Sequence, residues 1–122
     1  MRVFSFAQES TRFCNYSKGK FGGEITYVLP SWWDNTNDSV RSLFISSLDI
    51  AENCYIEMLD NGCKPQEARA VLPNALKTEV VMTGFVSDWK HFFDLRCAKN
   101  AHPDMQYLAN KLKKQFEDNN YI

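Results

Sequence analysis

The stretch from Asn37 to Asn61 reads NDSVRSLFISSLDIAENCYIEMLDN. Its apolar residues return every three or four positions, which is the period of an α-helix with one apolar face. The pattern therefore predicts a long helix over residues 37–61, with Gly62 as the residue that ends it. The apolar face consists of Val40, Leu43, Phe44, Ser47, Leu48, Ala51, Cys54, Tyr55, Met58 and Leu59.

Upstream of this helix, the chain carries two extended segments and a turn. Residues 1–13 alternate in polarity for a few positions and then become polar, which predicts a short strand that runs into a loop. Lys18–Glu24 contains three glycines and predicts a turn. Ile25–Leu29 then predicts a second strand, which Pro30 ends.

Downstream of the helix, prolines and polar residues mark the boundaries. Pro65 suits the first turn of a short helix that ends before Pro73. Residues 76–83 alternate with the period of a strand. Ser87 is expected to cap the next helix.

The last helix is expected to begin at Pro103, because proline is tolerated in the first turn, and residues 118–122 are expected to form a frayed tail. The order of elements predicts an α+β fold, in which antiparallel strands pack with the long helix and several shorter ones.

Composition excludes several classes of function. The 122 residues carry a formal net charge of −1, whereas a nucleic-acid-binding surface would be basic. The 4 cysteines are widely scattered, with no C-x-x-C pair and no spacing to His91 or His102 that is typical of metal ligands. No segment approaches the roughly 20 apolar residues of a membrane span. We therefore expect a cytoplasmic protein with no metal, no nucleic acid and no membrane partner.

Three arginines are candidates for anion binding. Arg12 follows Ser10 in a loop between two expected strands, where a hydroxyl and a guanidinium group can hold a phosphate together. Arg69 lies among apolar residues in the short helix, so its stem is expected to be buried, and a buried arginine needs an anion. Arg96 shares a helical face with aromatic side chains.

Each candidate also has a purely structural interpretation. An isolated arginine is usually solvated or paired with a carboxylate. Histidines such as His91 and His102 are more often packing or hydrogen-bonding residues than catalysts. The Trp32-Trp33 pair is more typical of a core than of a cofactor platform. From the residues alone, the chain is a soluble α+β domain with a candidate anion site.

Three motifs together add a resemblance. Residues 2–13, RVFSFAQESTRF, resemble most of the signature R-H-R-x-x-S-x-N-E-x-S-x-R-Y of the flavin-dependent thymidylate synthases. Residues 67–73, EARAVLP, resemble the E-x-A-R-x-x-L-P segment of that family, and residues 92–96, FFDLR, resemble its F-x-x-L-R segment. The motifs occur in the family's order, and the resemblance extends from residue 2 to about residue 116.

The resemblance implies an enzyme that methylates dUMP to dTMP. The carbon donor would be methylenetetrahydrofolate, FAD would carry the hydride and NADPH would be the reductant. Such an enzyme needs no cysteine nucleophile, because the reduced flavin supplies the redox chemistry.

By matching position, the resemblance assigns dUMP to side chains from all three motifs. These are Gln8, Ser10, Arg12, Arg69 and Arg96. Arg96 is also the expected catalytic residue, since it would contact the pyrimidine. Arg2 and His91 would face the FAD.

The chain also departs from the family pattern. Met1 stands where the signature has histidine, and Ala7 and Gln8 replace its asparagine and glutamate. The resemblance begins partway through the signature, so the N-terminal part of the family's domain is missing. Members of the family are homotetramers whose active sites combine several subunits.

We therefore expect residues 1–122 to be a partial domain of this family. It would comprise a signature loop and strand (1–30), the long helix (37–62) and a nucleotide-binding C-terminal part (65–117). The expected role is that of a truncated or split enzyme, completed by a homo-oligomer or by a complementing N-terminal fragment. The alternatives are a non-catalytic remnant or assembly subunit that retains a nucleotide site, and a helical interaction domain whose motif matches are accidental.

Overall fold

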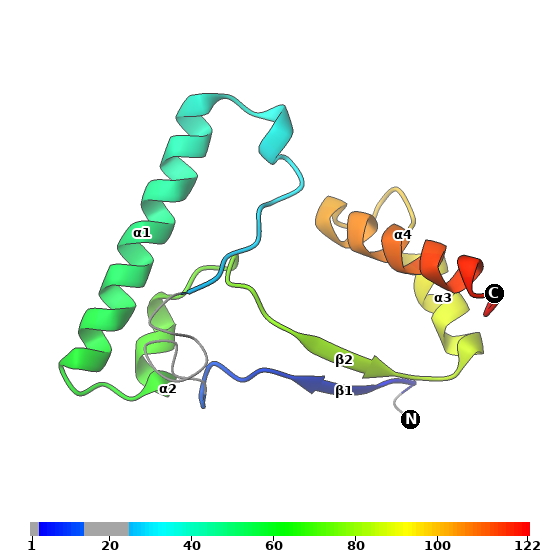
Figure 1. Ribbon diagram of the computed structural model, residues 1–122, viewed down its shortest axis with the longest axis horizontal. Coiled ribbons are helices and arrows are strands. Elements are labelled where there is room, and N and C mark those ends of the chain that lie inside the picture. Colours follow the sequence, from blue (N-terminus) through cyan, green and yellow to red (C-terminus); the bar gives the residue numbers. More distant parts are fainter. Residues whose placement is uncertain (1–2, 14–24) are drawn as a thin grey trace. The chain divides into compact units, whose positions relative to one another are not determined.

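A computed structural model describes residues 3–13 and 25–122 (Figure 1). The described part contains one two-stranded antiparallel sheet and four α-helices, which confirms the predicted α+β class. The chain divides into two compact units, which are described separately below. One unit contains residues 1–7 and 80–122, and the other contains residues 8–79. The predicted division into a signature segment, a long helix and a C-terminal part stays a prediction.

The dominant element of the unit formed by residues 8–79 is helix α1 (Asp38–Asp60). At its start, the side chain of Asn37 accepts a hydrogen bond of 3.0 Å from the Val40 amide. At its end, Gly62 has a φ of 93°, and the amides of Gly62 and Cys63 donate to the carbonyls of Leu59 and Met58. This pair of bonds is a Schellman motif, which satisfies carbonyls that the helix leaves open. The predicted helix and its terminator are confirmed.

A short helical segment follows α1. It consists of α2 (Pro65–Ala68) and the 3-10 turn η3 (Arg69–Val71). The core of the unit forms where this segment meets the C-terminal half of α1, and its buried members are Ile25, Tyr55 and Ala68. A second 3-10 turn, η2 (Trp33–Asn35), precedes α1.

The predicted strand over residues 25–29 is wrong as a regular strand. Only an isolated antiparallel bridge joins Tyr27 to Leu76, flanked by hydrogen bonds from Val28 to Ala75 and from Lys77 to Thr26. The predicted strand over residues 76–83 is shorter than expected, because β2 covers only Val80–Thr83. Residues 76–77 pair with residues 26–27, whereas residue 79 pairs with Glu9, so this segment has no single partner along its length. The glycine-rich turn expected at residues 18–24 lies outside the described residues.

The other unit contains the sheet and the last two helices. β1 (Ser5–Gln8) pairs with β2, as Figure 1 shows, which confirms the short N-terminal strand. Helix α3 (Val86–Arg96) packs against α4 (Pro103–Asp118). The contact is largely aromatic, with the ring of Trp89 lying 5.3 Å from that of Phe116 and 4.9 Å from that of Phe4, measured between centroids.

Two expectations for this unit are wrong. Ser87 does not cap α3: Phe85 holds that position, and its carbonyl accepts from the amides of Asp88 and Trp89. The last residues are not frayed, because Asn120 adopts a φ of 57° and the Tyr121 amide donates to the Phe116 carbonyl over 2.9 Å. The Tyr121 ring also packs against Phe116, so α4 ends in the same motif as α1. In the described part of the chain, no helix combines the length and the apolar character needed to cross a membrane.

Candidate anion-binding site

The candidate site begins with a tight turn directly after β1. The Phe13 amide donates to the Ser10 carbonyl over 3.1 Å, which closes the turn. Within it, the Arg12 amide donates to the Ser10 hydroxyl over 3.3 Å. Hydroxyl side chains of serine commonly stabilise turns in this way. The sequence Ser-Thr-Arg-Phe thus forms a compact loop that carries the Arg12 side chain on its surface.

The second part of the site is the segment α2–η3. Pro65 starts it, and the carboxylate of Glu67 accepts from the Lys64 amide over 2.7 Å, as in a capping box. Ala68 is fully buried in the core, whereas the next residue, Arg69, is exposed. The expected burial of the Arg69 stem is therefore wrong, because the small side chain of Ala68 occupies the position that faces the core.

Two side-chain hydrogen bonds join the loop to this segment. Arg12 donates through Nε to Oε1 of Gln66 over 2.9 Å. Arg69 donates through Nη1 to Oγ1 of Thr11 over 3.3 Å. The structure thus brings Ser10, Arg12 and Arg69 into one surface region, although more than fifty residues separate the loop from the helix.

The charges of Arg12 and Arg69 are not balanced locally. Both recorded hydrogen-bond partners are neutral, and neither guanidinium has a carboxylate partner within residues 3–13 and 25–122. Glu67, the acidic residue nearest to Arg69 in the sequence, bonds to the Lys64 amide instead. The Nη groups of Arg12 and the Nε and Nη2 groups of Arg69 have no hydrogen-bond partner in the described structure, although the Arg12 guanidinium lies over the Phe13 ring at 5.1 Å. Such donors, fixed by neutral anchors, suit a phosphate or carboxylate ligand.

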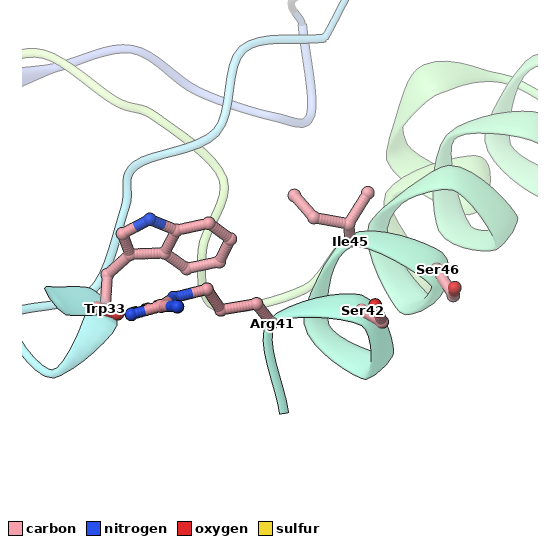
Figure 2. A pocket seen from close by; sticks show the side chains of 5 residues that line it. All are labelled: Trp33, Arg41, Ser42, Ile45 and Ser46. Carbon is pink, nitrogen blue, oxygen red and sulfur yellow. Dashed lines mark hydrogen bonds between the residues drawn. The ribbon is translucent and has the colours of Figure 1, made fainter. Parts of the chain in front are cut away.

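A contrasting arginine lies near the start of α1 in the same unit. Arg41 donates to the Trp33 carbonyl over 2.9 Å and pairs with Asp38 over 3.0 Å. Its guanidinium carbon also lies 5.7 Å from the centre of the Trp33 ring. Trp33 and Arg41 line an open depression of about 340 Å³. Ser42, Ile45 and Ser46 complete its lining (Figure 2). Because a carboxylate already balances Arg41, this depression is a weaker anion site than the Arg12–Arg69 region.

The Trp32-Trp33 pair has a packing role here. Both indole rings contact Phe44 edge to face, with centroids 5.7 Å and 5.8 Å away. Tyr55, which belongs to the same helix, lies in the core instead. The expected core position is therefore right for Tyr55 and wrong for the tryptophan pair, because Trp32 is exposed and Trp33 only half-buried.

No recorded contact joins the remaining expected site residues of the described part to Ser10, Arg12 or Arg69. Gln8 is exposed, and its amide nitrogen donates to the Thr78 hydroxyl over 3.3 Å. His91 and Arg96 are exposed on α3, in the unit that contains residues 80–122. A separation of five residues places them about 140° apart around the helix. Arg2 lies outside the described residues.

His102 has a structural role. Its Nδ1 accepts from the Asp104 amide over 3.2 Å at the start of α4. In the described part of the chain, no group of three or more histidine, cysteine, aspartate or glutamate residues could hold a metal ion.

Sequence reasoning missed Gln66 and Thr11, the two residues that anchor the arginines. A signal for Gln66 was present: when the E-x-A-R segment is aligned on Arg69, its glutamate falls on Gln66 and not on Glu67. For Thr11 there was no signal beyond its place between Ser10 and Arg12.

Comparison with known proteins gives a consistent result. The family described as "Thymidylate synthase complementing protein" matches residues 1–119. A flavin-dependent thymidylate synthase of Geobacter sulfurreducens is 31% identical over 108 residues, which cover 88% of this chain and 44% of that protein. The enzyme of the same name from Corynebacterium efficiens is 32% identical over 133 residues, covering 93% of this chain and 50% of the relative. The chain thus spans about half the length of the curated relatives that it matches.

Proposed function

The chain belongs to the thymidylate synthase complementing protein family, and from this premise we propose that it forms the nucleotide-binding part of a flavin-dependent thymidylate synthase. In this proposal, dUMP is methylated to dTMP with methylenetetrahydrofolate as carbon donor, FAD as hydride carrier and NADPH as reductant. The chain spans about half the length of its relatives. In this proposal, further chains or segments contribute to the active site. These are other copies in a homo-oligomer or a complementing N-terminal fragment.

One observation carries the proposal: two exposed guanidinium groups, those of Arg12 and Arg69, are held beside Ser10 by neutral partners. A nucleotide phosphate carries up to two negative charges and accepts several hydrogen bonds at once. Two arginines that lack carboxylate partners meet both requirements. We assign the phosphate of dUMP and its neighbouring groups to Ser10, Arg12 and Arg69.

The base of the nucleotide needs other contacts. Gln8 presents an exposed amide close in sequence to the loop, and we assign it to dUMP as well. Arg96 is assigned to the pyrimidine as the catalytic residue, because a fixed cation can stabilise negative charge that develops on the ring during methyl transfer.

Two residues of this chain, His91 and Arg2, are assigned to FAD. His91 is exposed on α3, so its imidazole can reach a ligand outside the helix, which fits a contact to FAD. Arg2 is assigned to the flavin with it. When bound, FAD would supply the hydride transfer, and the role of these two residues is to bind and orient it.

Calorimetric titration of the chain with dUMP, with deoxyuridine as the matched ligand without phosphate, tests the nucleotide assignment. We expect dUMP to bind at least a hundredfold more tightly, because two charge-assisted contacts of about 1.5–3 kcal/mol each are lost with the phosphate. Equal affinities for the two ligands would contradict the assignment.

The alternative function is that of a non-catalytic remnant or assembly subunit that retains the nucleotide site. It is favoured by the departures at Ala7 and Gln8, where the family signature has asparagine and glutamate. Adding the N-terminal half of a relative separates the two. Deoxyuridylate-dependent oxidation of NADPH by the mixture supports a split enzyme, whereas binding of dUMP without turnover supports the remnant.

A further inference from the structure

We propose that Gln66 and Thr11 are positioning residues, whose neutral oxygen atoms orient Arg12 and Arg69 and preserve the full positive charge of the pair for a phosphate dianion. This inference rests on the proposed function, since it concerns the same site. It adds Gln66 and Thr11 to the residues of the site, as groups that act through the arginines. It also explains how Arg12 and Arg69 retain their positive charge.

The argument begins with the geometry of each guanidinium. Gln66 accepts from Nε of Arg12 over 2.9 Å, so it holds the inner edge of the group and leaves both outer Nη groups available. Thr11 accepts from one Nη of Arg69 over 3.3 Å and leaves the Nε and the other Nη. Each anchor fixes one donor of an arginine and leaves the remaining donors for a ligand, which a guanidinium with five N–H donors allows.

The second step concerns charge. A carboxylate at either anchor would form an ion pair with the arginine and repel an incoming phosphate. An amide and a hydroxyl provide the same type of acceptor without that charge. Arg41 shows the contrasting arrangement in this chain, because Asp38 already balances it.

The third step concerns the two segments. Arg12 lies in the loop and its anchor in α2, whereas Arg69 lies in η3 and its anchor in the loop. The two bonds therefore cross between the segments in opposite directions. Each segment supplies one arginine and one anchor. Within its own loop, the Arg12 guanidinium also lies over the Phe13 ring, with its carbon 5.1 Å from the ring centre.

The test compares Gln66→Glu with Gln66→Met, which has a similar length but no oxygen acceptor. Binding is measured by calorimetry with dUMP and, separately, with inorganic phosphate. We expect Gln66→Glu to weaken binding of both probes by about tenfold or more, equivalent to about 1.4 kcal/mol, while the melting temperature stays the same or rises. Gln66→Met should weaken binding less, because the orientation is lost but no charge is added. Thr11→Val should act in the same way as Gln66→Met, through Arg69.

A pH series gives a result that a purely structural role would not produce. The loss caused by Gln66→Glu should disappear relative to wild type as the introduced carboxyl group becomes protonated, at a pH below its ordinary pKa of about 4.3 because Arg12 favours its charged form. Asn53→Asp is the matched control, because it makes the same amide-to-carboxylate change at an exposed position of α1 in the same unit. It should leave both affinities unchanged.

The outcomes separate this inference from the proposed function. If Gln66→Glu binds both probes as wild type does, the positioning role is overturned and the nucleotide assignment stands. If wild type binds dUMP no better than inorganic phosphate, the nucleotide assignment fails, and a loss of phosphate binding in Gln66→Glu still supports the positioning role. If wild type binds neither probe, both are overturned.

Discussion

At the scale of single residues, Arg69 offers the clearest separation of binding from stability. Its side chain is exposed, and its one recorded hydrogen bond goes to a threonine hydroxyl, so truncation opens no cavity and leaves no charge unpaired. We expect Arg69→Ala to weaken dUMP binding by one to two orders of magnitude, from the loss of one contact of about 1.5–3 kcal/mol, with little change in melting temperature.

Arg41→Ala is the matched control for this prediction. It removes an arginine of the same unit that does have a carboxylate partner and a tryptophan contact. It should lower the melting temperature and leave the affinity for dUMP unchanged. The opposite pattern, with unchanged affinity and a lower melting temperature in Arg69→Ala, would remove Arg69 from the site.

A second residue, Tyr27, gives the chain a pH-dependent contribution to stability. Its hydroxyl donates to the Leu48 carbonyl over 3.4 Å. Burial, together with the carboxylates of Glu52 and Asp49, raises the pKa of Tyr27 above its ordinary value of 10.0. In the unfolded chain the hydroxyl ionises near its ordinary pKa, whereas in the folded chain it stays protonated to higher pH. This contribution is therefore fully present below pH 10 and is lost as the pH rises through the folded pKa.

Tyr27→Phe tests this linkage by urea denaturation at several pH values. Near neutral pH the variant should be less stable by about 0.5–1.5 kcal/mol, the usual value of one hydrogen bond. The difference should shrink above pH 10, because the variant has no group to ionise. Lys77 and Lys114 also have raised pKa values, through Glu79 and Asp118. Wild type and Tyr27→Phe both contain these lysines, so their contributions to the stability difference cancel. A constant difference up to pH 11 would contradict the assignment.

Only some residues of the candidate site could be predicted from the sequence. Motif spacing identified Ser10, Arg12 and Arg69, because these positions match a recurrent pattern. For Gln66, aligning the E-x-A-R segment on Arg69 would have marked the position, but not its contact with Arg12, which lies 54 residues away. Thr11 could not be identified in this way, since its contact with Arg69 spans 58 residues and no local pattern encodes it.

At the scale of elements, helices were predicted far better than strands. The bounds of α1 follow from local signals, an asparagine cap and a glycine with positive φ, which act within a few residues of each end. The extent of a strand depends on a partner that is distant in sequence. Residues 76–83 alternate throughout as a strand does, but they pair with different segments along their length, and only Val80–Thr83 forms a regular strand.

Two glycines allow a prediction about how elements end. Gly62 has a φ of 93°, but a Cβ atom there would meet nothing within 4 Å, so Gly62→Ala should cost only backbone strain of about 1–2 kcal/mol. At Gly84 a Cβ atom would lie 2.5 Å from the Phe4 ring, so Gly84→Ala should displace that ring from Trp89.

Thermal melting and tryptophan fluorescence distinguish the two variants. Gly62→Ala should lower the melting temperature without changing the emission of the native protein. Gly84→Ala should shift the native emission, since Phe4 packs against Trp89 at 4.9 Å between ring centroids. Unchanged emission in Gly84→Ala would mean that the ring is not held where the structure places it.

At the scale of the whole molecule, α1 carries two apolar faces. Leu48 and Tyr55 are buried, whereas Leu43 and Ile50 are 71% and 63% exposed. The two pairs lie about 140° apart around the helix, so covering one leaves the other open. An exposed apolar face of this kind is typical of a surface that associates with another chain.

We therefore predict that the chain self-associates in solution, as light scattering coupled to size-exclusion chromatography would measure. Replacing both Leu43 and Ile50 with glutamine should shift the mass toward the monomer. Ser42→Gln is the control, because Ser42 lies about 100° around the helix from Leu43. This variant should leave the measured mass unchanged. A wild-type monomer that melts cooperatively would count against the prediction.

The crossed hydrogen bonds between the loop and the α2–η3 segment have a thermodynamic consequence. An anion held by both Arg12 and Arg69 would act as a reversible cross-link between parts of the chain that lie more than fifty residues apart. Because the unfolded chain cannot hold such a ligand, its binding free energy adds to the free energy of unfolding and grows with ligand concentration. The size of the cellular nucleotide pool would then set the fraction of molecules that remain folded, and with it their lifetime against proteases.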